Sequence, residues 1–386
     1  MRIEAARMTT LREGLDQPLL WVALVLLLWG LVMVTSASLQ IADTHLGAPF
    51  HYGMRHAVYL ALGVLVASVV IGLVSIEWLR QLRFLALPVA VLLLMLVFIP
   101  GLGREVKGAL RWIQVGGFTV QPSELAKLCF VVYMAGYITV HGETLRQSWK
   151  GFLMPFSVLG LLALLLMMEP DFGAVVVFGV TTMGMLFLAR VPLRRFLLVG
   201  LVLGALVTLL AFAQPYRVAR LLSFMDPWSD QFGAGYQLTQ SLIAFGRGDW
   251  FGVGLGNSIQ KLFYLPEAHT DFVYAVTAEE FGLFGNLLLL GLFVFFCCRI
   301  FLLGGRLEEH GMRFHAFLVY GIALLFSSQI MINLAVNMGL LPTKGLTLPF
   351  FSYGGSSLLV SIVMVALVLR AALELRARQG KRGGVS

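Results

Sequence analysis

Four carboxylates gather in segment 257–280, where a long polar stretch gives way to an apolar run. Glu267 and Asp271 stand four residues apart at that junction, and Glu279 and Glu280 lie inside the apolar run. A carboxylate at such a boundary can act as a general base that takes a proton from an attacking hydroxyl. Aspartate is also a favoured helix N-cap, so the position of Asp271 by itself supports both interpretations.

The other acids and the histidine near Asp271 also have more than one interpretation. Glu267 would assist the base, bind substrate or be a solvated loop acid, and His269 would contact substrate or be structural. Glu279 and Glu280 follow Asp271 by eight and nine residues, which is about 12–14 Å along a helix. Ionisable groups are costly at that depth in a membrane, so we expect each to be protonated or to meet a cation.

Basic side chains recur in the other polar segments. Glu124 and Lys127 are three residues apart on one helical face, which predicts either an intramembrane ion pair or the wall of a charged cavity. Arg111 precedes them and could reach an anionic ligand. Arg217 and Arg220 share a face that is either solvated or available to an anion.

The late segment 344–357, KGLTLPFFSYGGSS, opens a helix with Ser352, Gly354 and Gly355. Backbone N–H groups at a helix start favour phosphate, and Lys344 adds positive charge, although an ordinary helix start explains the pattern as well. Cations around one carboxylate suit a lipid-linked pyrophosphate substrate. The carboxylate would activate a hydroxyl, and the cations would stabilise the departing pyrophosphate.

These residues must be held by an integral membrane protein. The chain is 59% hydrophobic and 12% charged with a mean hydropathy of +0.88, whereas soluble domains carry roughly 25% charged residues. About ten apolar runs approach the 20 residues that a crossing helix needs, and we therefore predict an all-α polytopic membrane protein with about ten transmembrane helices. The runs lie at 19–38, 57–75, 84–99, 123–140, 151–168, 172–189, 196–213, 272–298, 316–335 and 356–370.

Lysine and arginine predict the orientation of the chain. When connections are assigned alternately to the two sides, 18 of the 28 cations fall on one side. The positive-inside rule then places both termini in the cytoplasm. Cytoplasmic tails at 1–18 and 371–386 flank a membrane domain at 19–370, and 214–270 forms a large extracytoplasmic loop between spans seven and eight.

Three external segments are too long for simple connections. They are 100–122, 214–270 and 336–355, and their aromatic residues indicate loops folded against the membrane surface. Within the second segment, 236–245 predicts a short helix lying in the interface. Asp171, in the external turn before the sixth span, is expected to cap that span.

Several other functions are disfavoured. No basic tract coincides with stacking aromatics in a soluble module, which argues against nucleic acid. The cysteines Cys129, Cys297 and Cys298 all lie in apolar runs and form neither a disulfide framework nor a zinc spacing. No metal-ligand spacing is present, so no cofactor is firmly implied. A divalent cation would be held weakly, by Asp271 and a diphosphate.

Four motifs in order carry a specific resemblance: QPSELAK, GYQLTQSLIAFGRGDWFGVGLGNS, LPEAHTDFVYAVTAEEFG and PTKGLTLPFFSYGGSS. They closely resemble the shape, elongation, division and sporulation (SEDS) family of membrane peptidoglycan polymerases, and the segments SFMDPW and QKLFYLPEAHTDF look more like its division-type branch. The resemblance implies a ten-span fold and lipid II glycosyltransferase activity in the bacterial cytoplasmic (inner) membrane, at the division septum. It also implies a class B penicillin-binding protein with transpeptidase activity as partner, alongside other division proteins.

The resemblance also assigns residues. The essential loop aspartate of the family falls on Asp271, and its loop arginine, fourth-span lysine and late-loop lysine fall on Arg111, Lys127 and Lys344. The implied reaction joins the GlcNAc 4-hydroxyl of lipid II to the undecaprenyl-pyrophosphate-linked glycan, with inversion and with Asp271 taking the proton. One base suffices for a single displacement, unlike the close carboxylate pair of retaining glycosidases. Phe263 stands where some relatives have an acid, so an acid there is not essential in this chain.

Three other functions remain open from the sequence. A lipid II flippase would use Glu124, Lys127 and Glu280 along a polar path for the lipid. A non-catalytic scaffold would only recruit the transpeptidase and would tolerate Asp271→Asn. An elongation-type polymerase would use the same chemistry in a different cellular role.

Overall fold

The computed structural model describes residues 14–106, 109–115, 118–212, 224–233, 235–343 and 345–383. Each of the ten predicted apolar runs coincides with a helix. These helices are α2 (Gln17–Leu46), α3 (His51–Leu73), α5 (Arg83–Leu96), α6 (Pro122–Gln147), α7 (Trp149–Met168), α8 (Phe172–Leu188), α9 (Leu193–Phe212), α12 (Val273–Glu309), α13 (Arg313–Asn337) and α14 (Gly355–Gly383).

Seven of these helices are long and apolar enough to cross a membrane within the described residues, and α5 and α8 are shorter apolar helices. The seven are α2, α3, α6, α7, α12, α13 and α14. α13 is buried over 83% of its most apolar stretch and packs against α6, α8 and α12. A helix that is apolar on every face belongs inside a bundle, so α13 forms its centre.

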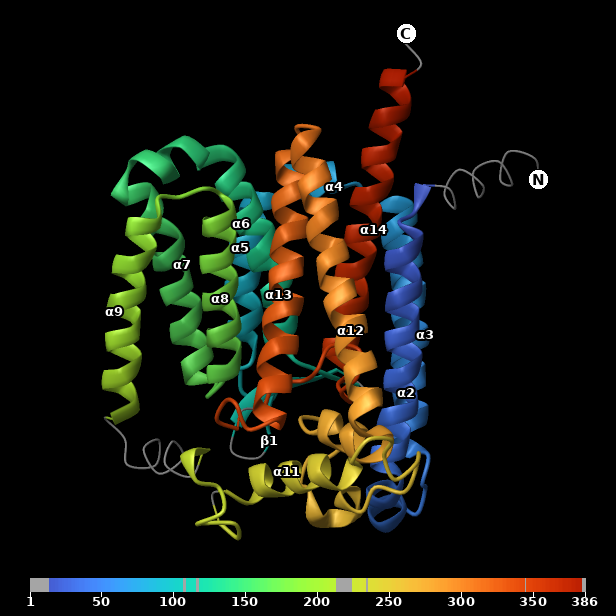
Figure 1. The fold of residues 1–386 in the computed structure, drawn as a ribbon. Helices are drawn as coiled ribbons and strands as arrows, with labels where there is room; N and C mark the ends of the chain where they lie inside the picture. The colour runs from blue at the N-terminus through green and yellow to red at the C-terminus, as the bar shows by residue number, and fades with distance from the viewer. Residues whose placement is uncertain are drawn as a thin grey trace, which may run out of the picture.

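The long helices stand side by side, and the two ends of the bundle differ (Figure 1). The start of α2 and the last turns of α14 lie at one end, which we call the terminal end. At the other, the loop end, α11 (Tyr236–Gly248) lies across the helix ends beside a small β-sheet. A short helix α4 (Ile76–Gln81) lies at the terminal end, and a π-helical turn η1 (Gln260–Tyr264) belongs to the loops.

The sheet at the loop end was not predicted from the sequence. Strands β1 (Gly103–Val106), β2 (Ala109–Val115) and β3 (Phe118–Val120) pair antiparallel in the order β1-β2-β3. Side chains alternate along β2, so Arg111 and the buried Ile113 share the face turned to the helix ends. Strands this short give a weak signal beside apolar runs of twenty residues, which explains why only a loop was predicted here.

Segment 345–354 folds back into the bundle, and we call it the re-entrant loop. The amide of Asn333 donates to Leu346 O, whereas the Phe350 ring lies 5.3 Å from Phe326 on the same helix. Asn333 and Phe326 are seven residues apart on α13, so the segment extends about 10 Å along that helix. Non-helical backbone at membrane depth must be buried in protein, and Phe350 is 2% exposed. The loop can pack this closely against α2 because residue 30 is glycine: a Cβ at Gly30 would lie 2.0 Å from Phe350 O.

Basic residues at the terminal end hold helix ends together. The guanidinium of Arg195 donates to the carbonyls of Leu145, Gln147 and Ser148 at 3.0–3.1 Å and lies 5.2 Å from the Trp149 ring. The last carbonyls of a helix have no partner within it, and a cation there satisfies them. Arg195 therefore stabilises the junction between these helix ends.

The last helix is longer than its apolar run. The predicted span ends at residue 370, but α14 continues as a helix to Gly383, so most of segment 371–386 is helical. Figure 1 shows this extension projecting past the neighbouring helices.

Candidate active site

Asp271 lies at the loop end, immediately before α12. The helix N-cap is Phe272, without a side-chain capping bond, so the interpretation of Asp271 as the N-cap is wrong. The main chain of Asp271 is instead held from α13: its carbonyl accepts hydrogen bonds from Asn333 Nδ2 and Asn337 Nδ2, both at 3.0 Å. The backbone is therefore fixed independently of the carboxylate, which is half-buried.

The re-entrant loop comes close to this carboxylate. A Cβ built at Gly345 would lie 3.1 Å from Asp271 Oδ2. Asn333 Nδ2 also donates to Leu346 O at 2.6 Å, so one amide group joins the Asp271 backbone to the loop. Lys344, the preceding residue, lies outside the described residues, as do Arg217 and Arg220.

Gly345→Ala tests how close the loop must come. The added methyl group would crowd the Asp271 carboxylate at a distance tighter than ordinary carbon–oxygen contact, and misplacing a catalytic group by about 1 Å can cost about 10²-fold. We expect kcat to fall by at least tenfold, with thermal unfolding little changed. Gly160→Ala is the matched control, since a Cβ there meets no atom within 4 Å. A Gly345→Ala enzyme of normal kcat would contradict the placement of the loop.

Glu280 is paired with a cation, which is one of the two alternatives predicted from the sequence. Its carboxylate accepts from Lys261 Nζ at 2.6 Å and from Ser36 Oγ at 2.8 Å, and Lys261 Nζ donates to Ser36 Oγ at 2.9 Å. The side chains of Lys261 and Glu280 are 5% and 0% exposed. This buried network joins α12, η1 and α2.

Glu279 holds the adjacent loop. Its carboxylate accepts from Ser258 Oγ, from Ile259 N at 3.0 Å and from Gln260 N at 3.2 Å, and Arg247 Nε lies 3.5 Å away. An anion that accepts several N–H and O–H groups is well stabilised even when buried. Both acids therefore dock the loop segment before Asp271 onto α12.

The helix itself is broken where this loop docks. Gly282 has φ 65° and ψ −164°, a conformation that favours glycine. On the N-terminal side of the break, helix carbonyls that have lost their helical partners accept hydrogen bonds from Val253 N at 2.9 Å and Gly254 N at 3.1 Å. On the C-terminal side, Leu283 N and Phe284 N donate to Asp249 O and Trp250 O at 2.8 and 3.1 Å. The loop thus replaces the missing helical bonds, as a broken membrane helix requires.

α11 is part of the same assembly. The predicted helix at 236–245 is present, but Ser241 is buried and donates to Asn337 O at 2.7 Å. Asn337 in turn donates to the Asp271 carbonyl, so the contact with α11 helps to fix the position of Asp271.

Aromatic rings surround His269, two residues before Asp271. Tyr52 lies 5.1 Å from His269 and 5.1 Å from Tyr353, and His269 and Tyr353 are 5.8 Å apart by ring centroids. Tyr353 N also donates to His269 O at 2.9 Å. Burial raises the pKa of the Tyr353 phenol, and the positive charge of Arg55 opposes that shift. Tyr52 and Arg55 were not predicted as site residues from the sequence, although the polar start of α3 was a visible signal.

His56 lies beneath this cluster, 6.2 Å from the Tyr353 ring. It is 0% exposed, and neither ring nitrogen has a hydrogen-bond partner among the described residues. Burying an unsatisfied polar group costs about 1–3 kcal/mol. We expect His56→Leu to raise the free energy of unfolding by that order, as measured by thermal unfolding in detergent. A destabilised variant would show that the imidazole has a partner in the folded protein.

Arg111 is held against the turn between α7 and α8. Its Nε donates to Glu169 O at 3.1 Å, and its Nη2 donates to Pro170 O. Asp171 caps α8 as predicted, accepting from Ala174 N at 3.1 Å. A role for Arg111 in binding substrate stays a prediction.

Glu169 gives this turn a pH dependence. Its side chain is fully buried, and its carboxyl oxygens lack hydrogen-bond partners in the described part of the chain. Burial, and then the charge of Asp171, raise its pKa to about 8. The folded protein thus binds this proton more tightly than the unfolded chain, so stability is lost as the pH rises from about 4.5 towards 8.

Glu169→Gln should remove this dependence, because glutamine does not titrate. Each unit of raised pKa corresponds to about 1.4 kcal/mol. We expect the wild-type Tm to fall between pH 5 and pH 8 and the Tm of the variant to fall less. Parallel Tm curves for the two proteins would contradict the raised pKa.

Glu124 and Lys127 form the predicted ion pair at 2.8 Å, and both side chains are buried. The pair lies in the first turns of α6. Nearby, Ser356 Oγ of α14 accepts from Gln121 N at 2.9 Å and donates to Thr119 O at 3.2 Å. Lys127 would need to leave Glu124 to reach a substrate, so its predicted role in the cavity stays a prediction.

The remaining predicted residues shape the loops. Ser352 Oγ accepts from Leu348 N at 2.7 Å and is buried, so its hydroxyl closes the re-entrant loop. Glu267 accepts from Thr270 Oγ1 at 2.8 Å in the turn before Asp271. A Cβ at Gly355 would lie 2.4 Å from the Tyr59 ring, which explains glycine at the start of α14.

Gly354 is less constrained, since a Cβ there would meet only ordinary contacts at 3.5 Å or more. Substrate contacts by Ser352 and Glu267 are not tested by these bonds and stay predictions.

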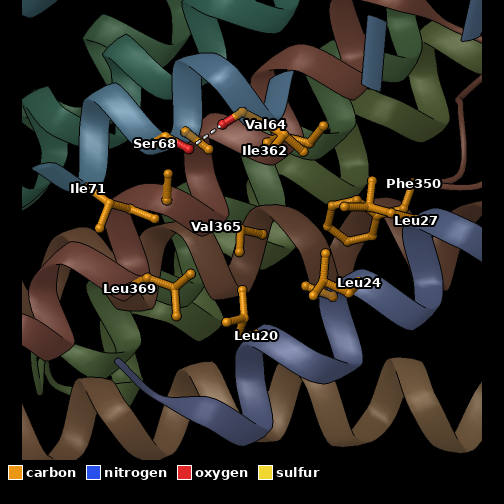
Figure 2. A pocket seen from close by; sticks show the side chains of 13 residues that line it. Leu20, Leu24, Leu27, Val64, Ser68, Ile71, Phe350, Ile362, Val365 and Leu369 are labelled. Atoms are coloured by element: carbon orange, nitrogen blue, oxygen red, sulfur yellow. Dashed lines mark hydrogen bonds between the residues drawn. The ribbon is translucent and has the colours of Figure 1, made fainter. Parts of the chain in front are cut away.

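A separate groove of about 140 Å³ lies between α2, α3 and α14 (Figure 2). It is lined by apolar side chains such as Leu24, Leu27 and Val365, with Phe350 at one end. Among the described side chains that line it, Ser68 is the polar one, and it donates to Val64 O at 2.8 Å. None of these described lining side chains is titratable, so we place the reactive centre at Asp271 instead.

The fold and the site together define a class. This is a polytopic helical membrane protein that holds a half-buried carboxylate at one end of the bundle, between the docked loop before α12 and the re-entrant loop. A family model described as "Cell cycle protein", covering FtsW, RodA and SpoVE, matches residues 17–377. The chain therefore belongs to the SEDS family.

Curated relatives share this family over nearly their whole length. "Probable peptidoglycan glycosyltransferase FtsW" of Alcanivorax borkumensis is 64% identical over 94% of both chains. The protein of the same name from Pseudomonas fluorescens is 53% identical over 95% of this chain and 90% of its own.

Solved structures share the fold. A chain from the structure described as "Structural coordination of polymerization and crosslinking by a peptidoglycan synthase complex" has a TM-score of 0.77 and 29% identity, covering 94% of this chain and 98% of its own. The rod shape determining protein RodA of Thermus thermophilus has a TM-score of 0.68 and 28% identity, covering 94% and 97%.

Proposed function

We propose that this protein is a peptidoglycan glycosyltransferase that polymerises lipid II into β-1,4 glycan strands, with Asp271 as the general base. The observation that carries this proposal is the position of Asp271. Two asparagines of α13 fix its main chain, and its carboxylate lies beside Gly345 of the re-entrant loop. The names of the curated relatives support the reaction class.

The reaction is a single displacement at a sugar carbon. The 4-hydroxyl oxygen of lipid II forms a bond to C1 of the lipid-linked strand, and the bond from C1 to the diphosphate oxygen breaks. The hydroxyl proton passes to Asp271, and undecaprenyl diphosphate leaves with the bonding electron pair. Displacement from one side inverts the α-linked donor to a β-1,4 product.

The leaving diphosphate needs positive charge. Arg111, Lys127, Arg217 and Lys344 are the proposed sources, because preorganised cations stabilise charge as it develops. A weakly held divalent cation between Asp271 and the diphosphate would serve the same purpose. The protein residues would hold such an ion only together with substrate.

We place ten spans in the bacterial cytoplasmic membrane, with both termini in the cytoplasm and segment 214–270 outside. The arrangement in Figure 1 supports this, because the start of α2 and the last turns of α14 lie opposite α11 and the sheet. The partner is a class B penicillin-binding protein at the division septum. The relatives named FtsW, at 50–64% identity, favour the division role over the elongation role of RodA at 28%.

The test is lipid II polymerisation by purified protein with its transpeptidase partner in detergent micelles. Micelles have no two sides, so a flippase would leave no product there, whereas a polymerase produces glycan strands. A complex that makes no strands, yet moves lipid II across vesicles, would favour the flippase.

A further inference from the structure

Three half-buried rings meet beside Asp271, and they come from three separate parts of the chain. Tyr52 belongs to the first turn of α3, His269 to the loop before α12, and Tyr353 to the re-entrant loop. Their centroids are 5.1–5.8 Å apart. We call Tyr52, His269 and Tyr353 the ring cluster.

The positions of these rings are fixed by contacts below them. The face of α3 that carries Tyr52 continues through His56, which lies 6.2 Å from Tyr353, to Tyr59 against Gly355 and to Gly63 against Ile362. The bond from Tyr353 N to His269 O joins the two loops at 2.9 Å. The cluster is therefore a built surface at the loop end, two residues from the proposed base.

The ring cluster differs from aromatic residues that anchor a protein in the membrane interface. Trp250 and Phe251 are 57% and 80% exposed at the loop end, as expected for interface anchors. The cluster rings instead turn towards one another on the inner face of α3. They also carry two phenol hydroxyls and an imidazole, which donate and accept hydrogen bonds.

We propose that the ring cluster is a saccharide-binding platform for a sugar ring of the lipid-linked substrate. A pyranose packs the C–H groups of one face on aromatic rings and directs its hydroxyl and amide groups to neighbouring donors and acceptors. Binding sites combine such apolar and aromatic walls with a few placed polar groups. A sugar on this platform would lie next to Asp271, so the platform would orient the hydroxyl that the base deprotonates. This inference rests on the proposed function.

The test compares two lipids that share a tail and a diphosphate. Lipid II carries the disaccharide, and undecaprenyl diphosphate does not. Equilibrium binding of each is measured in detergent to the full-length protein carrying Asp271→Asn, which prevents turnover. Tyr52→Leu is added to remove one ring, and Tyr52→Phe to keep the ring without its hydroxyl. Tyr264→Leu is the matched control, because Tyr264 is 52% exposed on the neighbouring turn and lies outside the cluster.

We expect Tyr52→Leu to weaken lipid II binding about tenfold, the size of one aromatic contact, and to leave undecaprenyl diphosphate binding unchanged. Tyr52→Phe should recover most of the lost affinity. In the polymerising enzyme, Tyr52→Leu should raise KM more than it lowers kcat.

Equal losses for both lipids would overturn the proposal, because they would indicate a structural role for Tyr52. No loss for either lipid, or a loss as large with Tyr264→Leu, would overturn it as well. Failure of the proposed function is a separate result. In that case the wild-type complex makes no glycan, while the selective effect on lipid II binding persists.

Discussion

Asp271→Asn is expected to abolish glycan synthesis and to leave the protein folded. Asparagine keeps the size of the side chain but cannot take a proton, and general-base catalysis contributes about 10²–10⁴-fold. The fold should tolerate the change, because Asn333 and Asn337 bind the Asp271 backbone carbonyl and Phe272 is the N-cap of α12. The measurement is lipid II polymerisation with the partner protein, together with thermal unfolding.

The matched control is Asp226→Asn, an exposed aspartate in segment 214–270, which should retain full activity. If Asp271→Asn polymerises lipid II at the wild-type rate, neither the proposed base nor the mechanism stands. Such a result would favour the scaffold function, which needs no reactive carboxylate.

Lys261→Met should cause the largest loss of stability. It removes the cation that lies 2.6 Å from Glu280 and leaves that carboxylate fully buried, with Ser36 as its one remaining side-chain partner among the described residues. Breaking a buried ion pair from one side costs about 3–5 kcal/mol. Because the pair ties η1 to α12 and α2, we also expect a lower yield of folded protein and reduced activity. Thermal unfolding in detergent measures the effect.

Two further variants serve as controls for this prediction. The double variant Lys261→Met, Glu280→Gln removes both charges and should recover most of the lost stability, because no unpaired charge stays buried. Arg80→Met breaks an ion pair to Glu77 in which both side chains are more than 40% exposed, and exposed pairs contribute about 0–1 kcal/mol. Equal Tm losses for Lys261→Met and Arg80→Met would show that the Lys261 pair is not buried.

Local sequence predicted what local physics controls. A run of about twenty apolar residues in lipid has one stable form, the helix, since each backbone group must find a partner within the segment. The ten helices therefore matched the ten runs. The pairing of Glu124 with Lys127 follows from a spacing of three on one helix, and the capping by Asp171 follows from a turn of four residues.

Contacts between segments far apart in the sequence could not be predicted in this way. Glu279 and Glu280 were expected to be protonated or paired, but nothing nearby in the sequence indicated Lys261 as the cation or Ser36 of the first long helix as a partner. The asparagines that hold Asp271 follow it by 62 and 66 residues. The three strands were missed because short strands gain their stability from pairing, which a hydropathy reading does not see.

By itself, the sequence determined a membrane protein with about ten apolar helices and with reactive groups concentrated on one side, because burial in lipid constrains each segment independently of the others. Only the tertiary structure decided which groups share the site: α13 holds Asp271, the re-entrant loop comes to its carboxylate, and three rings meet beside it. Those choices depend on how helices pack and where a loop can enter between them, and packing is a property of the whole bundle.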